Sequence, residues 1–365
     1  MSEKKVFFGG IMKKREKCLC GSEKKYTKCC IKLEDKFGEE EALKIALGEK
    51  EYSNFSKQLK ICSHYDKKNC SDEIIKAHSI QNNKILKKIS KNGYVCMPKV
   101  EIEENMCDIN FREIGRKQAT TFTGFCKVHD KIVFQPIEDK EYKGTAEQKF
   151  LFAYRAIALE NYKKKKVLHM LRETFKLSPH ALWKNIIFKD YVTGIELGNR
   201  DTNYYLKKFN KALLKQKYDI IETKEIIFDY EVKFACCGTS QIDRDLEGNI
   251  INNFYDLDIV KLFFLNIFPN DGKTVILISY LKEDTYYKEM LNKVMEFEDK
   301  KKKRFFNILI ASSIENIAVN PEFWESFSKE EKESFYSIFN DFDNIRPILE
   351  GKNLFDTEIK YDFFK

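Results

Sequence analysis

The sequence predicts an α+β protein, in which small cysteine-rich N-terminal modules precede a helical middle region and an α+β C-terminal domain. Three observations lead to this prediction. Nine of the 11 cysteines lie before residue 127, the middle of the chain repeats apolar residues at helical spacing, and the last third mixes β-branched runs with helical segments. We expect five segments, with the bounds 1–32, 33–60, 61–144, 145–217 and 218–365.

The composition is that of a folded chain that works in water. The 365 residues include 30 Phe and 18 Tyr, and 43% of the residues are hydrophobic, enough to fill more than one core. Mean hydropathy is −0.50, and no apolar run is long enough to span a bilayer. The N-terminus begins MSEKK without a signal-peptide pattern, so we expect a cytoplasmic protein with no membrane association.

Positive charge is concentrated at the start of the chain. The formal net charge is +8, and residues 1–30 carry nine Lys or Arg against three acidic residues, a local balance of 9 − 3 = +6. Such a basic head attracts phosphate backbones or acidic protein surfaces, although a solvated lysine-rich surface explains it equally well. Nucleic acid and protein partners are therefore both expected.

The first group of cysteines predicts a metal site. In a reducing compartment, clustered thiols serve as metal ligands and not as disulfides. Residues 18–30 read CLCGSEKKYTKCC, in which two close pairs flank a polar turn. Four thiolates so placed suit one tetrahedral Zn²⁺, whose binding would supply the folding free energy of this short segment. The predicted ligands are Cys18, Cys20, Cys29 and Cys30.

The same segment resembles the SEC-C zinc motif, which is known from the tail of the preprotein translocase ATPase and from many otherwise unrelated bacterial proteins. Glu23 stands where that family usually has glycine. Besides the four cysteines, the residues that match the motif are Gly21, Ser22, Lys25 and Tyr26. The resemblance implies a zinc knuckle that binds a protein partner and does not catalyse a reaction. Four free cysteines at this spacing are the alternative.

A second metal region follows a charged linker. Residues 33–60 predict helix with breaks at Gly38 and Gly48. Cysteine and histidine then recur in two paired elements, CSHYDKKNC and FCKVHD, and thiolate and imidazole ligands in pairs suit a second tetrahedral zinc site. The paired residues are Cys62 with Cys70 and Cys126 with His129. His64 is an alternative to either Cys62 or Cys70.

Two elements of this region resemble the HNH (ββα-metal) nucleases. The run KAHSI around His78 is similar to the first histidine motif of that family, and the element from Cys126 to Asp130 is similar to its closing motif. The resemblance implies a treble-clef-like ββα module in which His129 is the fourth zinc ligand. It also implies His78 as the general base that deprotonates a water, and Asp130 as a ligand of catalytic Mg²⁺ or Mn²⁺.

The region departs from the HNH pattern in two respects. The separation between Cys70 and Cys126 is longer than such modules usually show, and Asn82 and Asn83 follow His78 too closely to be the middle asparagine. A buried histidine that bonds a backbone carbonyl is the alternative for His78.

Basic residues precede the closing motif. A nuclease needs such side chains near phosphate, although surface charge explains them as well. The expected nucleic-acid contacts are Arg112, Arg116 and Lys117.

The rest of the chain carries no recognisable catalytic motif. Residues 145–217 predict helices that open at a capping box, Thr145-x-x-Gln148, and His169 and His180 are expected to be structural. In residues 218–365, IVKLFFLNIFP and TVILISYL joined by NDGK predict a buried hairpin. Helices are expected to follow, including FFNILIASSIENIA and one opening at Ser328-x-x-Glu331. This domain suits sensing or partner binding.

Two functions from different classes follow from the sequence. One is a metal-dependent HNH-like endonuclease with His78 and Asp130 as catalytic residues, which by analogy would suit bacterial antiviral defence. The other is a non-catalytic zinc protein whose knuckles bind nucleic acid, the ribosome or a protein partner. A redox or metal sensor that uses exposed thiolates is a weaker third.

Overall fold

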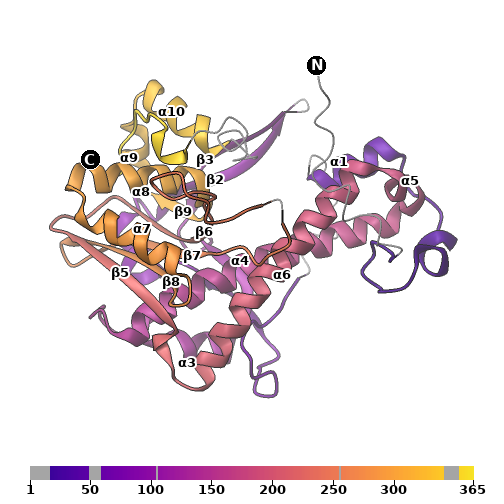
Figure 1. Cartoon of the computed structure of the whole chain (residues 1–365), viewed down its shortest axis with the longest axis horizontal. Coiled ribbons are helices and arrows are strands. Elements are labelled where there is room, and N and C mark those ends of the chain that lie inside the picture. Colours follow the sequence, from indigo (N-terminus) through magenta and orange to yellow (C-terminus); the bar gives the residue numbers. More distant parts are fainter. Residues whose placement is uncertain (1–16, 49–58, 104–105, 255, 341–352) are drawn as a thin grey trace. The chain divides into compact units, whose positions relative to one another are not determined.

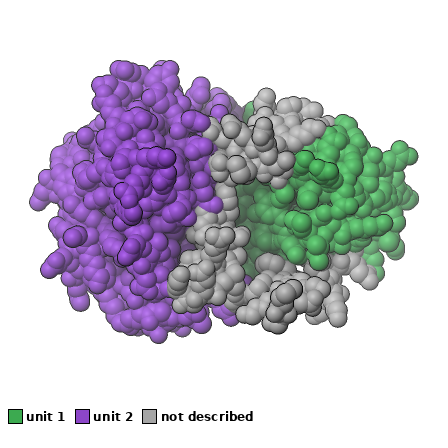
Figure 2. Space-filling view, turned by 90° about the horizontal axis from the view of Figure 1, so that it is seen from above, with its two compact units in different colours: residues 1–60, 161–204 green, residues 61–160, 205–365 purple. Residues whose placement is uncertain are grey.

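A computed structural model describes residues 17–48, 59–103, 106–254, 256–340 and 353–365. Most of the basic head, residues 1–16, and part of the expected linker, residues 49–58, lie outside the described residues. The chain divides into two compact units (Figure 2). The first consists of residues 1–60 and 161–204, and the second of residues 61–160 and 205–365.

Helices and strands are both plentiful, as expected for an α+β chain (Figure 1). The α-helices of the described residues are α1 (Glu39–Leu47), α2 (Lys87–Ile89), α3 (Lys127–Glu138), α4 (Ala146–Leu177), α5 (Pro179–Lys184), α6 (Ile186–Leu214), α7 (Thr285–Glu296), α8 (Asp299–Ser313), α9 (Pro321–Glu325) and α10 (Lys329–Phe339). The strands are β1 (Ile74–His78), β2 (Tyr94–Glu103), β3 (Met106–Gly115), β4 (Thr121–Cys126), β5 (Ile221–Phe228), β6 (Phe234–Ser240), β7 (Phe263–Asn270), β8 (Lys273–Leu281) and β9 (Ile317–Val319). No helix in the described ranges has the length and apolar character needed to cross a membrane.

Within the described residues, the strands form two antiparallel sheets, both in the second unit. A seven-stranded sheet has the order β3-β2-β9-β6-β7-β8-β5, and a separate two-stranded sheet pairs β1 with β4. The seven-stranded sheet therefore joins β2 and β3, which precede the long helices, to strands that follow them. The short strand β9 makes this junction, because it pairs with both β2 and β6.

The expected hairpin is present as β7 and β8. Their ladder runs from Phe263 opposite Tyr280 to Asn270 opposite Lys273, and the turn residues Asp271 and Gly272 have φ of 49° and 80°. Two successive left-handed residues match the right-handed twist of an antiparallel pair, which is why an Asp-Gly turn fits here. Both strands are buried almost throughout, as their near-continuous apolar sequences predicted.

Side chains on the two faces of this sheet enter different parts of the core. Phe263 lies against Tyr287 of α7, with ring centroids 5.2 Å apart. The next residue, Phe264, points to the other face and lies 5.1 Å from Phe209 of α6. On that same face Phe268 stacks on Phe152 of α4 at 4.8 Å. Helices therefore supply apolar partners to both faces of the strand β7.

Helix ends follow the capping residues that the sequence contains. Ser328 and Glu331 form the complete capping box predicted at the start of α10. At the start of α4, Thr145 Oγ1 accepts the Gln148 N–H at 3.2 Å, but the Gln148 amide turns away and donates to two backbone carbonyls. The segment FFNILIASSIENIA is helical only as far as Ser313; its last residues form β9, because pairing with β2 and β6 overrides their helical pattern.

Candidate metal centres

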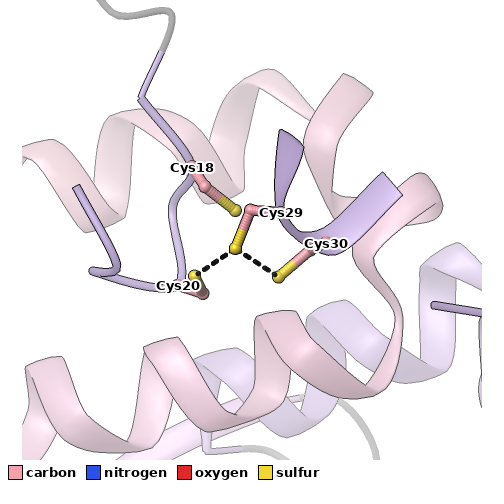
Figure 3. A group of neighbouring side chains, drawn as sticks. All are labelled: Cys18, Cys20, Cys29 and Cys30. Atoms are coloured by element: carbon pink, nitrogen blue, oxygen red, sulfur yellow. Dashed lines mark hydrogen bonds between the residues drawn. The ribbon is translucent and has the colours of Figure 1, made fainter. Parts of the chain in front are cut away.

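Four cysteines gather at one point of the first unit (Figure 3). Their Sγ atoms all lie within 4.8 Å of one another. The Sγ of Cys29 lies 3.5 Å from that of Cys20 and 3.8 Å from that of Cys30. These are the four residues of the predicted knuckle, Cys18, Cys20, Cys29 and Cys30. Four ligand atoms this close together, one from each residue, can hold a zinc ion.

The loop between the two cysteine pairs has a tightly constrained backbone. A bridge between Lys17 and Lys25 closes it, and the N–H of Cys18 donates to the Lys24 carbonyl at 2.6 Å. Gly21 has φ of +80°, and a Cβ added there would lie 2.6 Å from the Arg172 guanidinium carbon. The positive φ therefore favours glycine at position 21, and a Cβ there would also require the end of the Arg172 side chain to shift.

Tyr26 anchors the knuckle in the core of the first unit. Its ring stacks on Trp183 with centroids 4.2 Å apart, and its hydroxyl lies 2.9 Å from the Nδ1 of His180. Cys18 and Cys30 belong to the same buried cluster as Phe175 of α4. His180 and Trp183 lie on α5. The carboxylate of Asp35, which follows the knuckle in the chain, accepts the backbone N–H groups of His180 and Ala181 at the start of this helix. The knuckle is thus part of a helical core and not a separate appendage.

The thiols of this group differ in acidity. Burial raises the pKa of Cys18 and of Cys30. Burial also acts on Cys20, but hydrogen bonds from Ser22 and from neighbouring thiols outweigh it and lower the pKa of Cys20 to about 7. Several thiolates this close would repel one another, and a divalent cation removes that repulsion.

A second group of ligand atoms lies in the second unit. The Nδ1 of His129 lies 3.2 Å from the Sγ of Cys126, 3.5 Å from that of Cys62 and 3.6 Å from that of Cys70. All four ligand atoms lie within 4.8 Å of one another, so this group too can hold a zinc ion.

Local structure around β4 explains how these ligands meet. Cys126 ends β4 and caps α3, where its Sγ accepts the His129 N–H at 3.5 Å. Backbone bonds from Ile61 and Ser63 to β4 place Cys62 beside that strand. Burial raises the pKa of Cys70 to about 12. Burial acts in the same direction on Cys126, but N–H groups of His129 and Ser71 outweigh it and lower that pKa to about 6.

His64 lies beside the second group and not within it. Its ring stacks on the His129 ring with centroids 3.9 Å apart, and its Nδ1 accepts the Asp66 N–H at 3.2 Å. Burial, together with the charge of His129, lowers the pKa of His64 to about 4. A neutral ring packed on a ligand fixes the orientation of that ligand.

His78 and Asp130 lie on the elements that frame the second group. His78 ends β1, opposite Thr121 of β4, and its Nδ1 is 3.4 Å from the Thr120 hydroxyl oxygen. Asp130 lies in the first turn of α3. Burial lowers the pKa of His78 and raises that of Asp130. Among the described residues, neither side chain joins a group of three or more clustered metal ligands.

The three basic residues expected near phosphate occupy different positions. Arg112 is exposed on β3, and Lys117 is exposed in the turn that follows. The Nη1 of Arg116 donates to the Asn82 side-chain oxygen at 2.6 Å, and its charge acts on the His78 ring. Of the three basic residues, Arg116 is therefore the one whose charge affects the pKa of His78.

Two charged residues near His78 were not foreseen from the sequence. Glu138 ends α3, and Arg155 of α4 is buried. The charges of both act on His78 and on Asp130. The sequence signal that could have identified Arg155 is the run FLFAYRAIAL, in which this single arginine interrupts an otherwise apolar helical stretch.

Comparison with known proteins gives no relative for this chain. No family model matches it, and neither a curated protein nor a solved structure shows significant similarity.

Proposed function

We propose that this chain is a zinc protein whose second metal centre supports an HNH-like, metal-dependent endonuclease module. Each of the two Cys/His groups would bind one structural Zn²⁺. The observation that carries the proposal is the order of elements around the second group. There, an antiparallel pair, β1 and β4, runs directly into the helix α3, with two ligands of the group at the junction.

The position of His78 supports the role of general base. His78 ends the first strand of the ββα unit, and its half-buried ring has a lowered pKa because burial disfavours the charged form. A histidine that stays neutral near pH 7 is ready to accept a proton. In the proposed reaction His78 takes a proton from water, the water oxygen bonds to phosphorus, and the bond to the leaving oxygen breaks. That oxygen takes a proton from solvent.

The residues around His78 would serve the phosphate. Asp130 offers a carboxylate for Mg²⁺ or Mn²⁺, which when bound would stabilise the charge that develops on the phosphate. Arg116, whose charge acts on His78, would bind a phosphate oxygen near the reacting centre. Arg112 and Lys117 are exposed and would contact the nucleic-acid backbone farther away.

A second candidate function is binding without catalysis. The local partners of the half-buried His78 ring favour this candidate, because the ring has a backbone hydrogen bond with Ala119 and its Nδ1 lies 3.4 Å from the Thr120 hydroxyl oxygen. Both zinc centres would then hold surfaces that bind nucleic acid, the ribosome or another protein.

A cleavage assay distinguishes the two candidates. Plasmid DNA and structured RNA would be incubated with wild type, His78→Ala and His169→Ala, in Mg²⁺ and then in Mn²⁺. His169 is a half-buried histidine of α4 outside the ββα unit and serves as the control. The nuclease proposal predicts cleavage by wild type and His169→Ala, and a loss of about a hundredfold or more in His78→Ala at unchanged zinc content. Equal cleavage by His78→Ala would contradict it.

A further inference from the structure

The loop that carries Cys62 is held from two sides. Residues 59–73, which the structure describes throughout, form neither helix nor strand, so contacts with other elements must fix this loop. On one side the N–H of Ser63, the residue after Cys62, donates to the Gly124 carbonyl of β4 at 2.8 Å. On the other side the Ser63 carbonyl accepts the side-chain Nδ2–H of Asn210, on α6, at 3.0 Å. Both peptide bonds of Ser63 are therefore fixed.

A buried tyrosine fixes the orientation of the Asn210 amide. Tyr154 of α4 is 0% exposed, and its hydroxyl donates to Asn210 Oδ1 at 2.8 Å. A backbone carbonyl only accepts hydrogen bonds, so the amide nitrogen of Asn210 must face Ser63 and its oxygen must face Tyr154. Tyr154, Asn210 and the Ser63 carbonyl thus form one chain of hydrogen bonds with a single direction of donation.

The Tyr154 ring lies against the elements that carry the other half of the ligand group. Its centroid is 6.1 Å from that of Phe125 on β4 and 5.9 Å from that of Phe134 on α3. The remaining two ligands lie at the end of β4 and in the first turn of α3. Tyr154 therefore packs on these two elements and, through Asn210, also holds the loop that carries Cys62.

We propose that Asn210 and Tyr154 are positioning residues of the second metal centre, which hold the loop of Cys62 against β4 so that this thiolate reaches the metal. This inference rests on the proposed Zn²⁺ in the second group and does not depend on endonuclease activity. Hydrogen bonds around a metal site orient its ligands, and the loss of such a bond weakens metal binding by about tenfold to a hundredfold.

Zinc affinity tests this inference without any need for catalysis. Wild type, Asn210→Ala and Tyr154→Phe, each as full-length zinc-loaded protein, would be competed against a chromogenic chelator. The ion of the second group is identified as the one that Cys126→Ser lacks. Asn210→Ala is expected to raise the dissociation constant of that ion by about tenfold to a hundredfold, while the other ion keeps its affinity. Tyr154→Phe should act in the same direction but less, because Asn210 can still donate to Ser63.

Asn307→Ala and Tyr287→Phe are the matched controls, because both residues are buried in the second unit and bind backbone groups outside the loop of Cys62. They should lower the melting temperature but leave the zinc affinity unchanged. Unchanged affinity of the second group in both test variants, or an equal loss in the controls, would overturn the inference and leave the zinc proposal standing. Wild-type protein without zinc in the second group would overturn both. Should Asn210→Ala not fold, Tyr154→Phe decides the matter alone.

Discussion

Two positions of the first knuckle share a left-handed backbone but differ in their surroundings. Gly21 and Glu23 both have positive φ, +80° and 61°. At Gly21 a Cβ would also require the end of the Arg172 side chain to shift, whereas at Glu23 the side chain is exposed and pairs with Lys17. A left-handed backbone at a non-glycine residue costs free energy but leaves the fold intact. Glycine at position 23 would suit this backbone.

We therefore expect Glu23→Gly to stabilise the first unit. The substitution removes the strain of a left-handed glutamate, and the free energy of unfolding should rise by about 1 kcal/mol, less the small contribution of the exposed ion pair with Lys17. Thermal unfolding of the zinc-loaded protein measures the change. Glu23→Ala loses the ion pair and keeps the Cβ, so it should give no gain. A stability gain in Glu23→Ala as large as in Glu23→Gly would refute the backbone explanation.

Local sequence signals predicted single elements well. The hairpin β7–β8 followed from two apolar runs around an Asp-Gly turn, and α10 begins at the predicted capping box. The helix α1 is bounded by Gly38 and Gly48, and Gly48 has the left-handed conformation that ends a helix. Turns, helix caps and runs of apolar residues depend on a few adjacent residues, so they can be predicted from the sequence.

Contacts between segments far apart in the sequence could not be predicted in the same way. The three-residue strand β9 continues a segment with a helical pattern and is fixed only by its neighbours β2 and β6. The ion pair between Arg155 and Glu138 joins residues 17 positions apart on two helices. No periodicity specifies such a contact, because it depends on how α3 and α4 pack. The ligand groups could be anticipated only because cysteine is chemically distinctive.

The start of α7 carries a carboxyl group whose burial makes folding pH-dependent. Asp284 precedes the helix without a capping bond from its side chain, and burial, with the charge of Glu283, raises its pKa to about 6. The ordinary value is 3.8, so the folded state binds this proton more tightly than the unfolded state. The carboxylate therefore destabilises the folded state increasingly as pH rises from about 4 to about 6, and this destabilisation stays constant at higher pH.

Asp284→Asn should remove this cost. We expect the variant to be more stable than wild type by about 1 kcal/mol at pH 7.5, a figure reduced for partial exposure of the group, with a smaller gain at pH 5. Urea unfolding at the two pH values measures the difference. Asp258→Asn, which removes a carboxylate from an exposed loop, is the control and should leave stability nearly unchanged. A gain for Asp284→Asn that is larger at pH 5 than at pH 7.5 would contradict the burial of the charge.

In the second unit, residues far apart in the sequence form one folded body. The strands β2 and β3 lie in the chain between the two halves of the second ligand group, yet they extend the sheet formed by β5 to β9. Asn316, just before β9, donates to the Ser79 hydroxyl and to the Cys237 carbonyl, and so connects the end of β1 to the large sheet. If the second group holds zinc as proposed, loss of that ion would destabilise the sheet as well as the ββα unit.

The central claim, that the chain is a protein of two zinc centres, is tested most directly by counting zinc. Protein purified without chelator would be analysed by elemental mass spectrometry as wild type, Cys18→Ser, Cys126→Ser and Cys96→Ala, a buried cysteine of β2 outside both groups. The account predicts about two zinc ions per chain in wild type and Cys96→Ala, and about one in each of the other two, since each loses a ligand of a different tetrahedral group. Wild-type protein without bound zinc, or a full complement retained in Cys18→Ser and Cys126→Ser, would contradict it.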